Sequence, residues 1–202
     1  QAKTRHYESV SVLFSDFKGF TQLSEKLEPN ALVNQLDEYF KLFDSNTVKF
    51  GIEKIKTIGD AYMCAAGLPN ASSNHAQDLV GFAFAMLESV EQLNLRNAEK
   101  GLPNWQLRIG IHSGPVIAGV VGDKKFAYDI WGDTVNIASR MESSGSVGQI
   151  NISEATHVLI SDQYECEARG KIKAKNKGSM DMFFVLNSKN QSIHESLHKE
   201  RG

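Results

Sequence analysis

The spacing of apolar residues along the chain predicts its strands and helices. Residues 9–15 alternate as a strand does, and similar short runs follow at residues 52–58, 61–67, 106–113, 116–122, 127–131, 148–152, 164–172 and 180–186. Helical spacing appears in residues 29–50, 75–100, 134–143 and 153–160. Strands and helices therefore alternate along nearly the whole chain.

Glycine, proline and aspartate mark several ends of these elements. Pro29 suits the first turn of the first helix, and Gly51 suits its end. Gly114 and Pro115 predict a turn between two strands. Asp133 is the expected N-cap of the helix at residues 134–143.

The order of the elements predicts the fold class. A strand, a helix, a hairpin, a helix and a strand follow one another, as in a ferredoxin-like split βαβ arrangement. We expect an α/β (α+β) domain whose central sheet is mostly antiparallel, with helices packed on one face. The chain shows no internal repeat and no break in composition. We assign residues 1–8 to a linker remnant, 9–187 to one domain and 188–202 to a polar C-terminal tail.

Composition excludes several classes of partner and environment. The chain has 202 residues, of which 41% are hydrophobic, enough for a substantial core. A net charge of −2 provides no basic field for nucleic acid, so we expect no nucleic-acid partner. No apolar stretch reaches the roughly 18 residues of a membrane span, and no apolar signal region begins the sequence.

Cysteine usage and the first residues indicate the setting. Cys64 and Cys166 do not make a disulfide framework, which favours a reducing, cytoplasmic compartment. The sequence begins at Gln1 without a methionine. We therefore expect a piece of a longer protein with an upstream sensor or regulatory domain, which leaves a membrane anchor elsewhere open.

Two aspartates are the first candidates for chemistry. Asp16 follows the first strand, and Asp60 lies on the turn of the predicted hairpin at residues 52–67. The hairpin can lie beside the first strand and bring the two carboxylates together. A pair of carboxylates with few other protein ligands is what Mg²⁺ takes when it also binds substrate phosphates. The alternative is that each residue only ends a strand or forms a turn.

Five motifs together carry a family resemblance. They are FSDFKGFT at residues 14–21, KTIGD at 56–60, RIGIHSG at 108–114, WGDTVNIASRM at 131–141 and RGKI at 169–172. In this order they resemble the class III nucleotidyl cyclase catalytic domain over about residues 8–187. One motif alone would be weak, but five in register are specific.

The resemblance implies two Mg²⁺ or Mn²⁺ ions per active site. Asp16 and Asp60 match the metal ligands, with the Phe17 carbonyl as a third. The ribose 3′-hydroxyl would attack the α-phosphate while pyrophosphate leaves. Arg108 matches a triphosphate-binding arginine, and Lys175 falls where the family has another triphosphate contact, although here Asn176 replaces a glycine of the family pattern. The remaining phosphate ligands are the backbone amides of Lys18, Gly19, Phe20 and Thr21.

Two further residues match the family's transition-state pair. Asn136 and Arg140 are four residues apart and share a helix face. The resemblance makes Asn136 the group that orients the ribose. Arg140 would stabilise charge that develops on the α-phosphate. Without the motif, the same pair would read as a polar helix face.

Base choice depends on two other positions of the family pattern, which Lys56 and Asp129 occupy here. Adenine offers an acceptor at N1 and a donor at its 6-amino group. A lysine only donates and an ionised aspartate only accepts, so the pair complements adenine. Guanine presents the reverse pattern.

The resemblance therefore implies a homodimeric adenylyl cyclase of intracellular signal transduction. It would convert ATP to 3′,5′-cyclic AMP and pyrophosphate in sites built from both chains. The alternatives are a guanylyl or relaxed cyclase, an engineered specificity variant of a guanylyl enzyme, or a non-catalytic cyclase-like regulatory module. A palm-type polymerase shares paired carboxylates, but it would also need a basic surface for its template.

Overall fold

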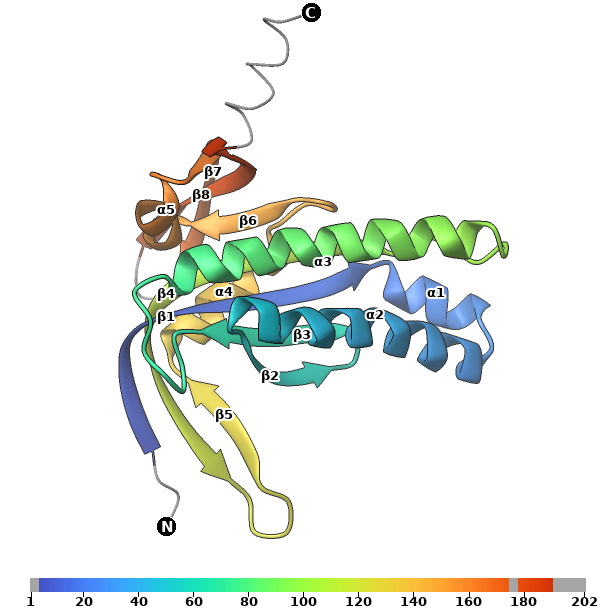
Figure 1. Ribbon diagram of the computed structural model, residues 1–202, viewed down its shortest axis with the longest axis horizontal. Helices are drawn as coiled ribbons and strands as arrows, with labels where there is room; N and C mark the ends of the chain where they lie inside the picture. The colour runs from blue at the N-terminus through green and yellow to red at the C-terminus, as the bar shows by residue number, and fades with distance from the viewer. Residues whose placement is uncertain (1–3, 175–177, 191–202) are drawn as a thin grey trace, which may run out of the picture.

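One sheet connects the elements of the computed structural model, which describes residues 4–174 and 178–190 (Figure 1). Across the described residues, seven strands lie side by side in the order β2 (Glu53–Ile58), β3 (Ala61–Ala66), β1 (Thr4–Lys18), β4 (Gln106–Val121), β6 (Ile150–Ser153), β8 (Gly178–Ser188) and β7 (Tyr164–Ala174). The strand β5 (Ala127–Trp131) pairs with β4 outside this row. Only β4 and β6 pair in parallel within this sheet of the described residues. The predicted α+β class with a mostly antiparallel sheet is confirmed.

Helices cover both faces of the sheet, so the prediction that they share one face was wrong. The helices are α1 (Phe20–Lys26), α2 (Pro29–Phe50), α3 (His75–Ala98), α4 (Asp133–Ser143) and α5 (Glu154–Ile160). On β1, Leu13 joins the core cluster under α2 and α3, whereas Val12 joins a second cluster with Ala138 of α4. Neighbouring strand residues point to opposite faces, so α4 lies across the sheet from α2 and α3. Within the described residues, no helix has the length and apolar character that a membrane crossing requires.

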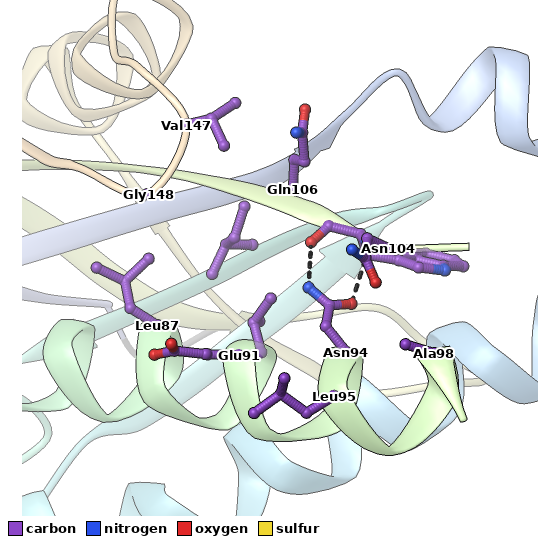
Figure 2. A pocket seen from close by; sticks show the side chains of 12 residues that line it. Leu87, Glu91, Asn94, Leu95, Ala98, Asn104, Gln106, Val147 and Gly148 are labelled. Carbon is purple, nitrogen blue, oxygen red and sulfur yellow. Dashed lines mark hydrogen bonds between the residues drawn. The ribbon is translucent and has the colours of Figure 1, made fainter. Parts of the chain in front are cut away.

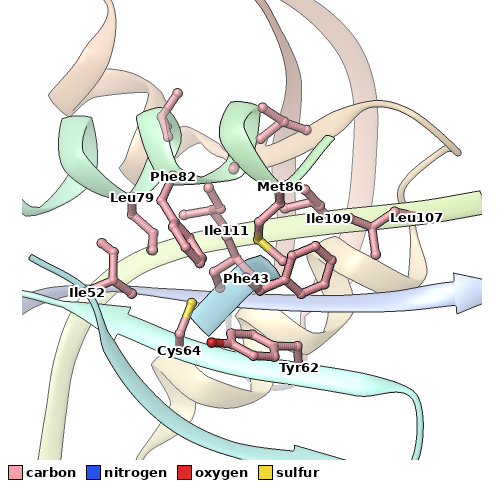
Figure 3. Close-up of a cluster of buried hydrophobic side chains, with 14 of the residues drawn as sticks. Phe43, Ile52, Tyr62, Cys64, Leu79, Phe82, Met86, Leu107, Ile109 and Ile111 are labelled. Carbon is pink, nitrogen blue, oxygen red and sulfur yellow. The ribbon is translucent and has the colours of Figure 1, made fainter. Parts of the chain in front are cut away.

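The larger core lies between the sheet and the helices α2 and α3 (Figure 3). Leu79, Phe82 and Met86 project from α3 toward Ile109 and Ile111 of β4, and all five are fully buried. Burying a side chain of this size contributes roughly 1.5–3 kcal/mol. This packing holds β1, β3 and β4 as one rigid platform.

The first strand begins earlier than predicted. It starts at Thr4, which pairs with Gly119 of β4, and Tyr7 of this segment is buried. Residues 4–8 therefore belong to the sheet and not to a linker.

The predicted turn at Gly114 and Pro115 is also wrong, because β4 continues through both residues. Pro115 lies opposite the register shift between Tyr7 and Val10, a place where a residue without an N–H group is tolerated.

Smaller differences concern helix ends and the C-terminal region. The helix α1 was not predicted, since it has only seven residues and none is buried. Asp133 is the first residue of α4, and the N-cap is Gly132. The residue directly after β8 still contacts the domain, because the Lys189 amide donates a hydrogen bond to the Gln163 carbonyl over 2.9 Å. The predicted tail beyond residue 190 lies outside the described residues.

A chain of buried hydroxyl groups meets a histidine where α3 begins. His75 Nδ1 lies 2.7 Å from Ser11 Oγ, and His75 Nε2 lies 3.0 Å from Ser9 Oγ. Ser11 continues to Ser113 and then to Thr156 through hydroxyl contacts of 2.6 and 2.9 Å. Burial lowers the pKa of His75, although the charge of Asp78 opposes this shift. The neutral imidazole therefore belongs to the folded state.

We predict that acid weakens the fold through His75. The unfolded chain takes up a proton near the ordinary histidine pKa of about 6.5, while the folded chain resists it. The contribution of His75 to the free energy of unfolding should therefore fall as the pH drops below about 6.5. Urea denaturation of wild type and His75→Asn at pH 7.5 and pH 5 isolates this contribution, because the other titrating groups are the same in both proteins. The control is His6→Asn, which removes an exposed imidazole from β1. An equal loss in wild type and His75→Asn would contradict the assignment.

Candidate active site

The two predicted metal-binding aspartates lie together beside the end of β1. Asp16 stands within β1, two residues before its end, and not in a loop after it. The hairpin of β2 and β3 pairs with β1 up to Ser15 and Tyr62, which carries its turn to the same place. There Asp60 Oδ2 accepts a hydrogen bond from the Phe17 amide over 3.0 Å. The hairpin thus brings Asp60 beside Asp16.

Aromatic packing anchors the backbone that follows. The Phe17 ring is buried against Tyr39 and Trp105, with ring centroids 5.1 and 5.0 Å apart. Phe20 also contacts Trp105. Gly19 takes a left-handed conformation with φ of 76°, which turns the chain from β1 into α1. The first amides of α1 are those that a helix leaves without intrahelical partners.

Arg108 forms an ion pair with Asp16. It lies opposite Asp16 in the pairing of β1 with β4. Its Nε and Nη2 groups donate to the two oxygens of Asp16 over 3.1 and 3.0 Å. This is the bidentate geometry that binds guanidinium and carboxylate groups strongly.

Glu142 is a buried carboxyl group that the sequence analysis missed. Its Oε1 lies 3.2 Å from Arg108 Nε, and its side chain is only 10% exposed. Burial raises the pKa of Glu142 to about 8, and the nearby charge of Asp16 adds to the shift. The position directly follows the WGDTVNIASRM motif, but nothing in the helical spacing indicates that a glutamate there is buried.

Gly110 explains how Glu142 reaches this position. A Cβ atom at Gly110 would lie only 1.9 Å from the Glu142 amide nitrogen. Only a glycine on β4 therefore lets α4 lie this close to the sheet. The close approach fixes the backbone of Glu142 beside Arg108.

The donor set suits a divalent cation. Asp16 and Asp60 supply carboxylate oxygens, and burial raises the pKa of Asp60, to which the nearby charge of Asp16 adds. Such a carboxylate pair is stabilised by a bound cation. In the part of the chain that the structure describes, no group of three or more histidine, cysteine, aspartate or glutamate residues could hold a metal ion. Two carboxylates fit Mg²⁺, which usually keeps waters and substrate oxygens as its other ligands.

The two predicted base-reading residues form a direct pair. Lys56 Nζ donates to Asp129 Oδ2 over 2.7 Å, and Asp129 Oδ1 accepts from the Ile130 amide. The Lys56 side chain is 44% exposed and that of Asp129 is 18% exposed. The lysine comes from β2 and the aspartate from β5, so the fold joins positions 73 residues apart.

Asn136 and Arg140 lie on another face of α4. Residues two apart on a helix point in nearly opposite directions, so Arg140 faces away from the site of Glu142. Its Nη1 group donates to the Lys173 carbonyl of β7 over 2.8 Å. Asn136 is exposed, one turn earlier on the same face as Arg140. Within the described chain, this pair is therefore separated from Asp16 and Asp60. Lys175 lies outside the described residues.

A separate groove of about 460 Å³ lies between α3 and β4 (Figure 2). Its lining includes Leu87, Leu95 and Val147. The Asn94 side chain also lines it, but its amide group is hydrogen-bonded to the backbone N–H and carbonyl of Trp105. None of the predicted site residues lines this groove. The candidate site around Asp16 and Asp60 therefore lies outside this groove.

Comparison with known proteins agrees with this geometry. The family model described as the adenylate and guanylate cyclase catalytic domain matches residues 2–187. The chain belongs to this family, and the predicted resemblance to class III cyclases is confirmed.

Curated and solved relatives include cyclases for both nucleotides. An adenylate cyclase of Mycobacterium tuberculosis is 42% identical over 183 residues, which cover 91% of this chain and 40% of that protein. The chain thus spans about two fifths of that relative's length. The adenylyl cyclase CyaB from P. aeruginosa superimposes with a TM-score of 0.86 and 32% identity, covering 93% of this chain and 97% of that one. The guanylate cyclase domain of RhGC from Catenaria anguillulae, solved in complex with GTP, superimposes with a TM-score of 0.85 and 34% sequence identity. This match covers 92% of this chain and 100% of that one.

We predict that Gly110→Ala weakens the fold by roughly 1–3 kcal/mol or more, because its methyl group overlaps the backbone of α4. Thermal denaturation measures the loss. The matched control is Gly81→Ala inside α3, where the new methyl group meets side-chain atoms and not backbone: the Phe50 ring at 3.0 Å and the Tyr164 hydroxyl at 3.8 Å. This substitution also gains helix propensity. Equal stability of both variants would show that α4 is free to move from β4.

Proposed function

We propose that the chain is an adenylyl cyclase catalytic domain that converts ATP to 3′,5′-cyclic AMP and pyrophosphate. The observation that carries the choice of ATP is the contact of Lys56 Nζ with Asp129 Oδ2 over 2.7 Å. Membership of a family that includes cyclases for both nucleotides does not itself select the base.

The pair offers adenine a donor and an acceptor side by side. The Lys56 ammonium can donate to adenine N1, and the Asp129 carboxylate can accept from the 6-amino group. The contact between them holds both groups in place before the base arrives. Guanine would set a carbonyl against the carboxylate and an N–H group against the ammonium, so both pairings would fail.

Asp16 and Asp60, with the Phe17 carbonyl, would hold two Mg²⁺ or Mn²⁺ ions. When bound, such ions lower the pKa of the attacking 3′-hydroxyl and neutralise charge on the leaving pyrophosphate. Arg108 and Lys175 would bind the triphosphate. The phosphate oxygens would also accept hydrogen bonds from the amides of Lys18, Gly19, Phe20 and Thr21.

Asn136 and Arg140 would complete the site of a second chain. Asn136 would orient the ribose, and the Arg140 guanidinium would stabilise charge on the α-phosphate. Because this pair is separated from Asp16 in its own chain, a homodimer with twofold symmetry would form two shared sites. Exposed apolar residues along β4, β5 and the loop between them support such a contact: Ile117, Val120, Val121, Phe126 and Trp131. In Figure 1, β4 and β5 extend together beyond the rest of the sheet.

The proposed setting is intracellular signalling. The catalytic domain would act in the cytoplasm, downstream of a sensor or regulatory domain in the full-length protein. A non-catalytic regulatory module would be expected to lack a metal-binding or transition-state residue, yet Asp16, Asp60, Asn136 and Arg140 are all present.

The test of substrate choice is incubation with ATP or GTP and Mn²⁺, followed by chromatographic identification of the product. Wild type should form cyclic AMP. Lys56→Glu with Asp129→Cys should shift the preference toward GTP, because each mismatch costs about 1–3 kcal/mol, or roughly ten- to a hundredfold in rate. Each single variant should mainly lose activity with ATP.

The control for this test is Lys54→Glu, which changes the neighbouring lysine of the same strand, paired with Asp44. It should leave the ATP preference intact. A folded, active double variant that still prefers ATP would show that Lys56 and Asp129 do not read the base. Cyclic GMP from wild type would identify a guanylyl cyclase instead.

Subunit complementation tests the shared site. Asp16→Ala and Arg140→Ala should each be inactive, while their mixture should regain activity. In a mixed dimer one site carries both changes and the other carries neither. Co-purification through two different affinity tags measures subunit exchange. Exchange without regained activity would mean that the two residues act within one chain.

A further inference from the structure

Arg108 occupies both oxygens of the aspartate that the proposed function assigns to metal binding. The Nε–Oδ1 and Nη2–Oδ2 hydrogen bonds of 3.1 and 3.0 Å use one lone pair on each oxygen of the Asp16 carboxylate. A divalent cation that approaches Asp16 on this face competes with the guanidinium group for the same lone pairs, and the two positive charges repel each other. A cation bound on this face therefore requires Arg108 to turn away from Asp16.

Glu142 offers Arg108 another partner at almost the same place. Its Oε1 atom is buried and lies 3.2 Å from Arg108 Nε, but the N–H bond is directed to Asp16. Among the described residues, Glu142 Oε1 consequently has no hydrogen-bond donor. A small rotation of the guanidinium would give this buried acceptor a donor.

We propose that Glu142 is a positioning residue that receives the Arg108 guanidinium when Asp16 binds a divalent cation. In the cation-free chain, Arg108 is bound to Asp16. After a cation has bound, Arg108 is bound to Glu142 and its guanidinium group stays beside the proposed phosphate-binding surface. Gly110 makes this exchange possible, because it lets α4 bring the Glu142 backbone against β4. The inference rests on the proposed role of Asp16 as a metal ligand.

Binding of Mn²⁺ to chain 1–202 without nucleotide, followed by electron paramagnetic resonance of the free ion, tests this exchange. Arg108→Met removes the competing cation, so the Mn²⁺ affinity should rise about tenfold. Glu142→Ala removes the second acceptor and should lower the affinity at least threefold. Glu142→Gln keeps an acceptor oxygen and should stay within about twofold of wild type.

The double variant Arg108→Met with Glu142→Ala separates positioning from direct charge effects. If Glu142 acts through Arg108, the double variant should match Arg108→Met alone. An equal loss from Glu142→Ala in both backgrounds, or no gain from Arg108→Met, would overturn the proposal. Lys54→Met controls for net charge and should leave the affinity unchanged.

Circular dichroism checks that each variant is folded. Glu142→Met fills the same space without an oxygen and replaces Glu142→Ala if that variant fails to fold. Because no nucleotide is present, the result is independent of substrate choice. A chain that shows these affinities but forms no cyclic nucleotide would contradict the proposed function and leave the exchange at Asp16 supported.

Discussion

The antiparallel pairing of β1 with β4 is the interaction on which the rest of the molecule depends. It runs from Thr4 with Gly119 to Lys18 with Gln106, interrupted only by the shift between Tyr7 and Val10. One end of this ladder sets Asp16 opposite Arg108, and the other supports the extension of β4 and β5. Because both faces of the ladder are covered by helices, its position is fixed by two hydrophobic clusters. The packing of the core therefore fixes the relative positions of the residues in the candidate site.

Much of this arrangement can be predicted from the sequence, because periodicity and local turn chemistry are local signals. The helix Pro29–Phe50, the strand Ala127–Trp131 and the hairpin that carries Asp60 all follow from such patterns. The meeting of Asp16 and Asp60 follows as well, since a hairpin beside the first strand leaves few other arrangements. The family motifs add the remaining candidate residues.

Other features depend on contacts between distant segments and leave no local signal. The turn predicted at Pro115 does not form, because the partner strand supplies a bulge opposite it. The face covered by α4 depends on Gly110, whose missing side chain matters only once α4 packs there. Glu142 looks like an ordinary helical glutamate until the fold buries it beside Arg108. The contact between Lys56 and Asp129 likewise joins two strands that are far apart in the sequence. No local pattern predicts that these two strands lie close together.

The separation of Asn136 and Arg140 from Asp16 has a consequence for control. If an active site needs both groups, single chains in dilute solution have no cyclase activity. The rate of product formation at low concentration then rises with the square of the chain concentration. Any attached segment that holds two chains together then acts by raising their effective concentration, which reaches the millimolar range for short linkers. Such control requires no rearrangement inside the domain. A rigid catalytic platform can therefore serve unrelated input signals, each of which needs only to change how often two copies meet.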